Sequence, residues 1–184
     1  MPSQGSIELH PEARNRFDTL FDAHYLTVFR YCLRRLGPAD GEDAAAEVFA
    51  IAWRRLDQVP PADATKAWLI AVAYRVVGNQ YRSRRRRFRL SERLRSEPMV
   101  EGAPIAGDEA RLVQETLDSL SKDDREILRL VAWDGLTRSE IASVIGIKAN
   151  AVDQRLFRAR TRFKEHFDRL TKNTPHMDPR EASA

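Results

Sequence analysis

The sequence predicts an all-α protein built from two small helical domains that a flexible linker joins. Apolar residues recur at helical spacing along most of the chain, and long runs of β-branched residues that would favour strands are missing. Glycine is scarce, with eight residues in 184. The charged share of 32% stands beside a hydrophobic share of 42%. This balance indicates small helical units with apolar cores and wide solvated surfaces.

The first unit is expected to span residues 14–90 and to contain three helices. Each is bounded by glycine or proline, and the expected ranges are 14–36, about 40–56 and 68–89. Gly37-Pro38 combines the usual helix stop with a residue that cannot continue a helix. Between the second and third helices, the loop Asp57–Lys66 contains two adjacent prolines and cannot be helical throughout. Helices joined by such short connections predict a compact bundle.

The third of these helices has two chemically different parts. Its first half carries paired apolar residues at the spacing of a buried stripe, so Trp68 is expected in the core. Its other face shows Tyr74, Arg75 and Asn79. Six arginines follow in residues 82–89. Most arginine runs are solvated faces, but a run joined to an exposed tyrosine and asparagine favours binding to nucleic acid.

A linker and a second unit are expected after this bundle. Residues 91–108 lose the helical periodicity and gain proline and glycine, which is typical of a linker. The second unit is expected at residues 109–170. The polar segment 171–184, which contains two prolines, is expected to be a disordered tail.

The second unit has the layout of a helix-turn-helix motif. Ser121 is placed to cap one helix, and Thr137 with Glu140 forms a capping box that opens a short helix. Gly146 ends this short helix. A last helix follows, and its outward residues are Asn150, Gln154, Arg155, Arg158 and Arg162. Because arginine suits the edge of guanine and the amides suit adenine, this layout favours duplex DNA over an ordinary solvated helix.

Signals of catalysis and of metal binding are missing from the sequence. The four histidines have no metal-ligand spacing, and neither a phosphate-binding loop nor a nucleophile elbow occurs. The single cysteine, Cys32, lies in an apolar pattern and is expected to be buried rather than redox-active. An enzyme, a cofactor and a metal are therefore not expected. No signal peptide or membrane-spanning run is found, which predicts a soluble cytoplasmic protein.

Three segments of the chain carry a family resemblance. They are EDAAAEVFAIAWRRL (42–56), KAWLIAVAYRVVGNQYRSRRRR (66–87) and LVAWDGLTRSEIASVIGIKANAVDQRLFRAR (130–160). In this order and spacing they resemble the extracytoplasmic-function (ECF) group of bacterial RNA polymerase sigma factors. The resemblance implies a subunit that binds core RNA polymerase and directs it to promoters. It also implies an inhibitory anti-sigma factor, and a chain that is monomeric when free or 1:1 with that inhibitor.

The resemblance assigns each unit a role. The first unit would be the sigma region 2-like domain, which binds core polymerase and melts single-stranded minus-10 DNA. The second would be the sigma region 4-like domain, which reads duplex minus-35 DNA. The loop Asp57–Lys66 would capture a flipped base of the minus-10 element, beside the third helix.

Three sets of site residues follow from the resemblance. The core polymerase-binding set is Asp43, Ala46 and Glu47. The minus-10 set is Tyr74, Arg75, Asn79, Arg82, Arg84 and Arg85. The minus-35 set is Thr137, Arg138, Lys148, Asn150, Gln154, Arg155 and Arg158.

The chain departs from the family pattern at several of these positions. Ala46 stands where the family often has glutamine, and Tyr74-Arg75 replaces a frequent Arg-Asn. At the start of the last helix, Lys148 cannot accept a hydrogen bond as a cap, and Asp153 brings negative charge near phosphate. The departure at Tyr74-Arg75 therefore implies a minus-10 preference different from that of other family members.

Two other interpretations remain open from the residues alone. The chain could be a stand-alone helix-turn-helix regulator that binds duplex DNA without polymerase, commonly as a dimer on spaced half-sites. It could also be an RNA-binding or scaffold protein that uses the arginine run. The last interpretation leaves the second unit unexplained.

Overall fold

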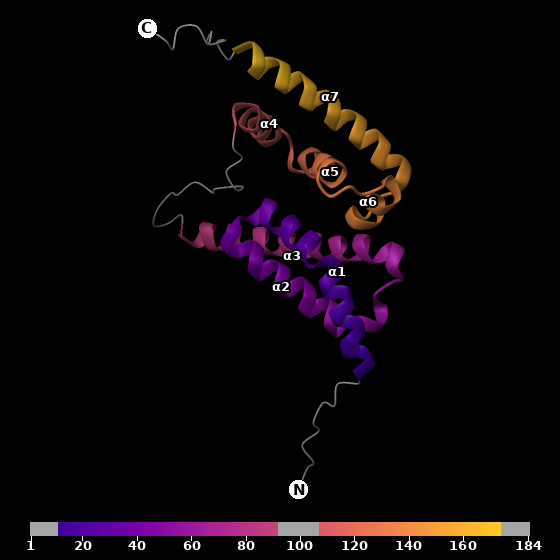
Figure 1. The fold of residues 1–184 in the computed structure, drawn as a ribbon. Coiled ribbons are helices and arrows are strands. Elements are labelled where there is room, and N and C mark those ends of the chain that lie inside the picture. Colours follow the sequence, from indigo (N-terminus) through magenta and orange to yellow (C-terminus); the bar gives the residue numbers. More distant parts are fainter. Residues whose placement is uncertain (1–10, 92–106, 174–184) are drawn as a thin grey trace, which may run out of the picture. The chain divides into compact units, whose positions relative to one another are not determined.

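A computed structural model describes residues 11–91 and 107–173, and each regular element within these two stretches is a helix (Figure 1). The helices divide into two compact units, α1–α3 and α4–α7. The elements are α1 (Pro11–Leu36), α2 (Pro38–Arg54), the 3-10 helix η1 (Leu56–Gln58), α3 (Ala62–Ser91), α4 (Asp108–Ser119), α5 (Lys122–Ala132), α6 (Arg138–Ile145) and α7 (Ala149–Asn173). The all-α prediction is confirmed.

Parts of the sequence prediction fall outside the described residues. These are most of the expected linker, residues 92–106, and the expected tail from residue 174 onward. The expected tail began at residue 171, but α7 runs to Asn173. Residues 171–173 are therefore helical, and the predicted helix end was too early.

An apolar core holds α1, α2 and α3 together. Its most deeply buried side chains include Val28, Tyr31, Cys32, Val48, Leu69, Ile70 and Val76. A half-buried stripe of aromatic rings on α1 adds to this core. The rings of Phe21 and Phe49 lie 4.8 Å apart, and those of Phe17 and Trp53 lie 5.0 Å apart. Aromatic pairs at such distances favour edge or tilted contacts, so this stripe fastens α1 to α2.

Helix α1 ends at Leu36 as predicted, but α2 starts earlier than predicted, at Pro38. Gly37 has a φ of 79°, a conformation that favours glycine, and Pro38 occupies the first turn of α2. A proline fits there because its missing N–H would have no helical partner. The sequence interpretation had placed the start at Asp40 or Gly41. Gly41 instead lies where a Cβ would come within 2.8 Å of the Leu33 Cα, so α1 and α2 approach closely here.

The start of α3 is also earlier than predicted. The helix begins at Ala62 rather than after Lys66. The hydroxyl of Thr65 donates to the carbonyl oxygens of Pro60 at 2.9 Å and of Pro61 at 3.1 Å. These bonds fasten the first turn of the helix to the proline pair, which local helix-start rules did not reveal.

The second unit follows its predicted capping chemistry. The Ser121 hydroxyl accepts a hydrogen bond from the backbone N–H of Asp124 at 3.2 Å, and Thr137 with Glu140 forms the expected capping box. Gly146 ends α6 with a φ of 74°. The buried core of this unit contains Leu117, Leu120, Ile127, Leu130, Ile141, Val144, Val152 and Ala159. The two predicted caps, which open α5 and α6, and the predicted glycine stop, which begins the turn between α6 and α7, are confirmed.

Candidate nucleic-acid interfaces

The outer face of α3 presents three polar side chains at helical spacing. Arg75, Asn79 and Arg82 are exposed, and Tyr74 is half-buried beside them. The Arg82 guanidinium donates to the side-chain oxygen of Asn79. This bond orients the amide so that its NH2 group points away from Arg82. Arg85, one turn further along, is also exposed. The face therefore combines an aromatic ring, an amide and several guanidinium groups.

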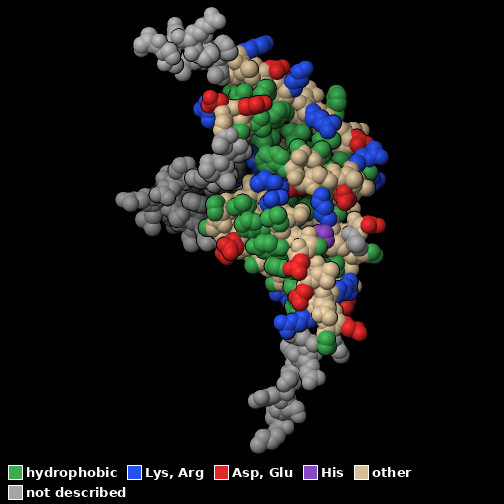
Figure 2. All heavy atoms as spheres, in the orientation of Figure 1, with side chains coloured by type: hydrophobic (Ala, Val, Ile, Leu, Met, Phe, Trp, Pro, Cys, Tyr) green, Lys and Arg blue, Asp and Glu red, His purple; other side chains and the backbone are tan. Residues whose placement is uncertain are grey.

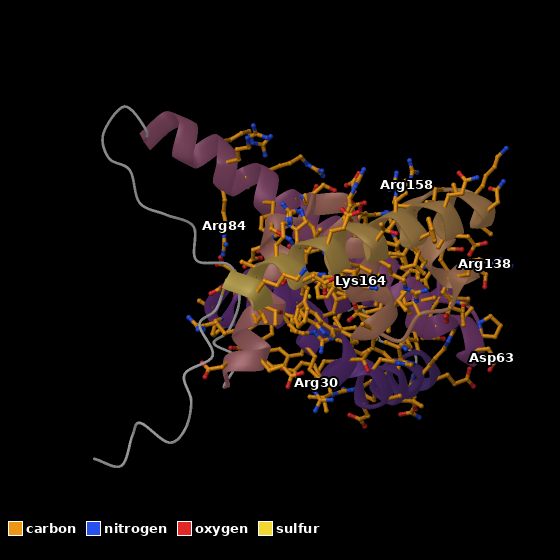
Figure 3. The ribbon with its side chains drawn as sticks, turned by 90° about the horizontal axis from the view of Figure 1, so that it is seen from above. Arg30, Asp63, Arg84, Arg138, Arg158 and Lys164 are labelled. Atoms are coloured by element: carbon orange, nitrogen blue, oxygen red, sulfur yellow. The ribbon has the colours of Figure 1, made fainter. Side chains whose placement is uncertain are left out.

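Arg84, labelled in Figure 3, is in contact with the end of α1 and with α2. Its Nη2 lies 3.4 Å from the carbonyl oxygen of Leu36, the last residue of α1, and its guanidinium pairs with the carboxylate of Asp40 on α2. Nearby, the Tyr81 hydroxyl donates to the carbonyl oxygen of Arg35. Carbonyls at a helix end lack partners within the helix, so α3 supplies donors to the end of α1. Arg84 thus has contacts within its own unit.

The exposed face of α2 carries the predicted polymerase-binding residues. Asp43, Ala46 and Glu47 are all exposed, and they share one side of the helix with the exposed Ala50. The opposite side is buried in the core. The structure therefore brings the predicted set together on an acidic surface with small residues between the charges.

The helix-turn-helix places most of the predicted minus-35 residues on its outer surface. Thr137 and Arg138 are exposed at the start of α6, and Lys148 is exposed in the turn. On α7, the exposed residues follow one face: Asn150, Asp153, Gln154, Phe157 and Arg158. The Nε of Arg158 donates to the carbonyl of Gln154 at 3.3 Å, which leaves its terminal amino groups facing solvent.

Phe157 is a residue that the sequence interpretation missed. Its side chain is 73% exposed, although it is large and apolar. Helical spacing in the sequence could have predicted this exposure. Phe157 lies outside the buried stripe of Val152 and Ala159, and it shares a helix face with Asn150. The apolar surface of α7 therefore extends onto its polar face.

Of the two remaining predicted outward arginines, Arg162 is exposed as expected and Arg155 is only half-exposed, and both form ion pairs with α5. Arg155 is half-buried and lies 3.9 Å from the carboxylate of Asp123 on α5. Arg162 pairs with the buried carboxylate of Asp124 at 2.5 Å. Both arginines reach toward the start of α5, because the acids that suit a helix N-terminus also attract them. On the face shown in Figure 2, Lys and Arg side chains are accordingly interspersed with acidic ones.

Neither a metal-binding cluster nor a membrane-spanning helix is found among the described residues. Among them, no group of three or more His, Cys, Asp or Glu side chains could hold a metal ion. Over the same part of the chain, no helix is long and apolar enough to cross a membrane. A helix-turn-helix with an exposed polar face on its second helix is the layout of a DNA-binding domain.

Comparison with known proteins shows which family of DNA-binding proteins this chain belongs to. The family model for sigma-70 region 2 matches residues 20–87, and that for sigma-70 region 4 matches residues 110–163. RNA polymerase sigma factor CnrH of Cupriavidus metallidurans is 32% identical over 143 residues, covering 70% of this chain and 74% of that protein. ECF RNA polymerase sigma factor SigK of Mycobacterium ulcerans is 27% identical over 154 residues, covering 78% and 81%. The chain belongs to the ECF group of RNA polymerase sigma factors, which are transcription initiation factors and not enzymes.

Solved structures show the same fold. The structure of CnrH in complex with the cytosolic domain of CnrY matches with a TM-score of 0.58 at 26% identity, over 85% of this chain and 94% of that chain. The structure of the sigma factor RpoE in complex with the anti-sigma factor NepR, from Bartonella quintana, matches with a TM-score of 0.67 at 22% identity. That match covers 83% of this chain and 96% of that chain. At this identity the second likeness concerns the fold alone.

Proposed function

We propose that this sigma factor docks on core RNA polymerase through α2, holds the opened minus-10 strand on α3 and reads the minus-35 duplex with α6 and α7. Asp43, Ala46 and Glu47 form the polymerase contact. The protein acts in the cytoplasm, where core polymerase and promoter DNA are available. The polymerase carries out the catalysis, and this chain contributes promoter binding and strand separation.

The observation that carries this proposal is a difference between the two polar surfaces. Tyr74, Arg75 and Asn79 on α3 offer a ring, a guanidinium and an amide. Unpaired bases stack on the first two kinds of group and are read at their edges by the third. The exposed face of α7 instead suits the major groove of a duplex. A regulator that binds only duplex DNA needs the second surface and not the first.

The loop before α3 adds a place for a flipped base. Asp57, Gln58 and Asp63 are exposed in this segment and at the start of α3. Side chains with hydrogen-bonding groups next to an exposed helix face can read the edge of a base that leaves the stack. The segment Asp57–Lys66, which contains the end of η1, the proline pair and the first turn of α3, therefore supports capture of one minus-10 base.

Core-dependent transcription tests the proposal. Purified protein is added to bacterial core polymerase, and transcripts from genomic promoter fragments are mapped. Selective initiation that requires this chain is expected, while the free protein binds the same duplexes poorly. Tight, salt-sensitive operator binding by the free protein, without any effect on initiation, would identify a stand-alone regulator instead.

A charge reversal on α2 tests the docking surface separately. Glu47→Lys should lower affinity for core polymerase, because it reverses an exposed carboxylate in the proposed contact. Glu165→Lys is the matched control, since Glu165 is exposed on α7. Equal affinity of the two variants for core polymerase would remove α2 from the docking surface.

An anti-sigma factor is the expected inhibitor. The related structures of CnrH and RpoE contain CnrY and NepR, respectively. We expect this chain to be monomeric when free and to form a 1:1 complex with its own inhibitor. Light scattering of the free protein checks the first expectation, and a dimer would contradict it.

A further inference from the structure

An ion pair joins the two helices of the helix-turn-helix on their outer surface. Nη1 of Arg138, in the first turn of α6, lies 2.7 Å from Oδ2 of Asp153 on α7. Both side chains are exposed, at 62% for Arg138 and 52% for Asp153. The contact uses one oxygen of the carboxylate and one of the several N–H groups of the guanidinium. The pair therefore keeps further hydrogen-bonding groups for a ligand.

The position of Asp153 on α7 places it among the residues that face DNA. Asn150 and Gln154 lie on the same exposed side within one turn, and Val152 on the opposite side is fully buried. A recognition helix lays its N-terminal exposed face in the major groove. Asp153 occupies the second turn of α7, so its carboxylate is within the part of the helix that reaches base edges.

We propose that Asp153 is a specificity-determining residue that accepts a hydrogen bond from the N4 amino group of a cytosine in the minus-35 major groove. Arg138 is its positioning residue. The inference rests on the proposed function, because it needs α7 in the groove of a promoter. A carboxylate can only accept hydrogen bonds, so it discriminates against the acceptor atoms that guanine and thymine present at that edge.

The partner explains how a carboxylate is tolerated close to phosphates. An unpaired negative charge would be repelled by the DNA backbone. The guanidinium of Arg138 neutralises this charge, and its remaining N–H groups can donate to a phosphate at the start of α6, where first helices of this motif cross the backbone. Because the observed contact uses Oδ2 of Asp153, the other carboxylate oxygen is available in this proposal to accept from a base.

A promoter library tests the proposal. Holoenzyme is assembled from core polymerase and the full chain, the minus-35 element is randomised above a constant minus-10 element, and bound and transcribed sequences are counted. The variants are Asp153→Ala, Asp153→Asn, Arg138→Ala and Arg138→Lys. Asp168→Asn is the control, because Asp168 is exposed on the same helix but lies about 22 Å further along its axis.

The wild type should prefer a C·G pair at one position, and Asp153→Ala should reduce that preference by about fivefold or more, the low end for one good base contact. Asp153→Asn should shift it toward adenine, which the amide can bind. Arg138→Ala should weaken the preference and Arg138→Lys should restore it. Asp168→Asn should change only the overall affinity.

Two results would overturn the proposal. If Asp153→Ala binds every sequence more tightly with an unchanged base preference, then Asp153 is only a repulsive charge. If both Arg138 variants keep the wild-type preference, then Arg138 does not position the carboxylate. Failure of the wild-type holoenzyme to select any minus-35 sequence would contradict the proposed function itself, and it is seen before any variant is compared.

Discussion

The two units of this sigma factor engage their arginines with different mixtures of partners. In the unit of α1–α3, Arg16 and Arg35 donate to the carbonyls of Val59 and Tyr31, and Arg84 bonds to the Leu36 carbonyl as well as pairing with Asp40. In the unit of α4–α7, carboxylates on α4 and α5 engage three arginines: Arg125 with Asp118, Arg155 with Asp123 and Arg162 with Asp124, and Arg125 also donates to backbone carbonyls. A count of arginines therefore overestimates the surface open to DNA. The residues that stay exposed are the ones to assign to nucleic acid.

The largest expected effect is a loss of minus-35 binding, and it should differ between two arginines of α7. Arg158→Ala should weaken minus-35 binding by about 1–3 kcal/mol, because its guanidinium is exposed on the face that we propose to lie in the groove. Arg155→Ala should have a smaller effect, since that side chain reaches toward α5. Competition between promoter fragments for holoenzyme measures both. Equal losses for the two variants would mean that Arg155 leaves Asp123 when DNA binds, and the comparison between the units would then fail.

Loss of the ion pair between Arg162 and Asp124 should have the next largest effect. Arg162→Ala should lower the free energy of unfolding by about 1 kcal/mol, because the buried carboxylate loses its counter-charge. Arg160→Ala, an exposed change on the same helix, should have little effect. Urea unfolding at low and high salt measures both, and the Arg162 effect should shrink as salt rises. If the loss of unfolding free energy is the same at low and high salt, Arg162 stabilises the fold through packing rather than through its charge.

Arg84 and Arg85 give a matched test in the first unit. Arg85→Ala should reduce the slope of log affinity against log salt by about 0.7 for single-stranded minus-10 DNA, because it removes one phosphate contact. Arg84→Ala should leave that slope unchanged and lower the melting temperature, since it removes the bonds to Leu36 and Asp40. The opposite pattern would place Arg84 on DNA and contradict its structural role.

The smallest expected effect is a pH dependence of the first unit. Burial lowers the pKa of His24 below its ordinary value of 6.5, and the charge of Lys66 lowers it further. The folded state therefore disfavours the protonated imidazole. Stability should be fully present above about pH 6.5 and should fall as the pH drops from there toward the lowered pKa. His24→Gln should flatten this part of the curve in urea unfolding, and an unchanged slope would exclude His24 as its source.

Local chemistry made some features predictable from the sequence and left others out of reach. The caps at Ser121 and Thr137 and the stop at Gly146 depend on neighbours within a few residues, so they could be found in the sequence. The partners of Arg84 and Arg155 lie on other helices and become visible only after packing. The predicted starts of α2 and α3 come too late in the chain, because Pro38 fits the first turn of α2 and because the bonds of Thr65 to Pro60 and Pro61 become visible only in the structure.

In the candidate sites, too, some features could be predicted from the sequence and others could not. The exposed faces of α2 and α3 followed from helical periodicity, which locates a surface without naming its partner. The pair of Arg138 and Asp153 could not be predicted, since it joins two helices across a turn whose geometry the sequence does not specify. Phe157 was missed because large apolar residues are expected inside.

The most direct measurement of the central claim is promoter opening by holoenzyme on two templates, a full duplex and one already unpaired at the minus-10 element. Fluorescence of 2-aminopurine in the minus-10 strand follows capture of the open strand. Arg158→Ala should slow capture on a duplex whose minus-35 element is intact, and Tyr74→Ala should weaken capture on both templates. Equal behaviour of the two variants on both templates would contradict separate roles for the surfaces of α3 and α7.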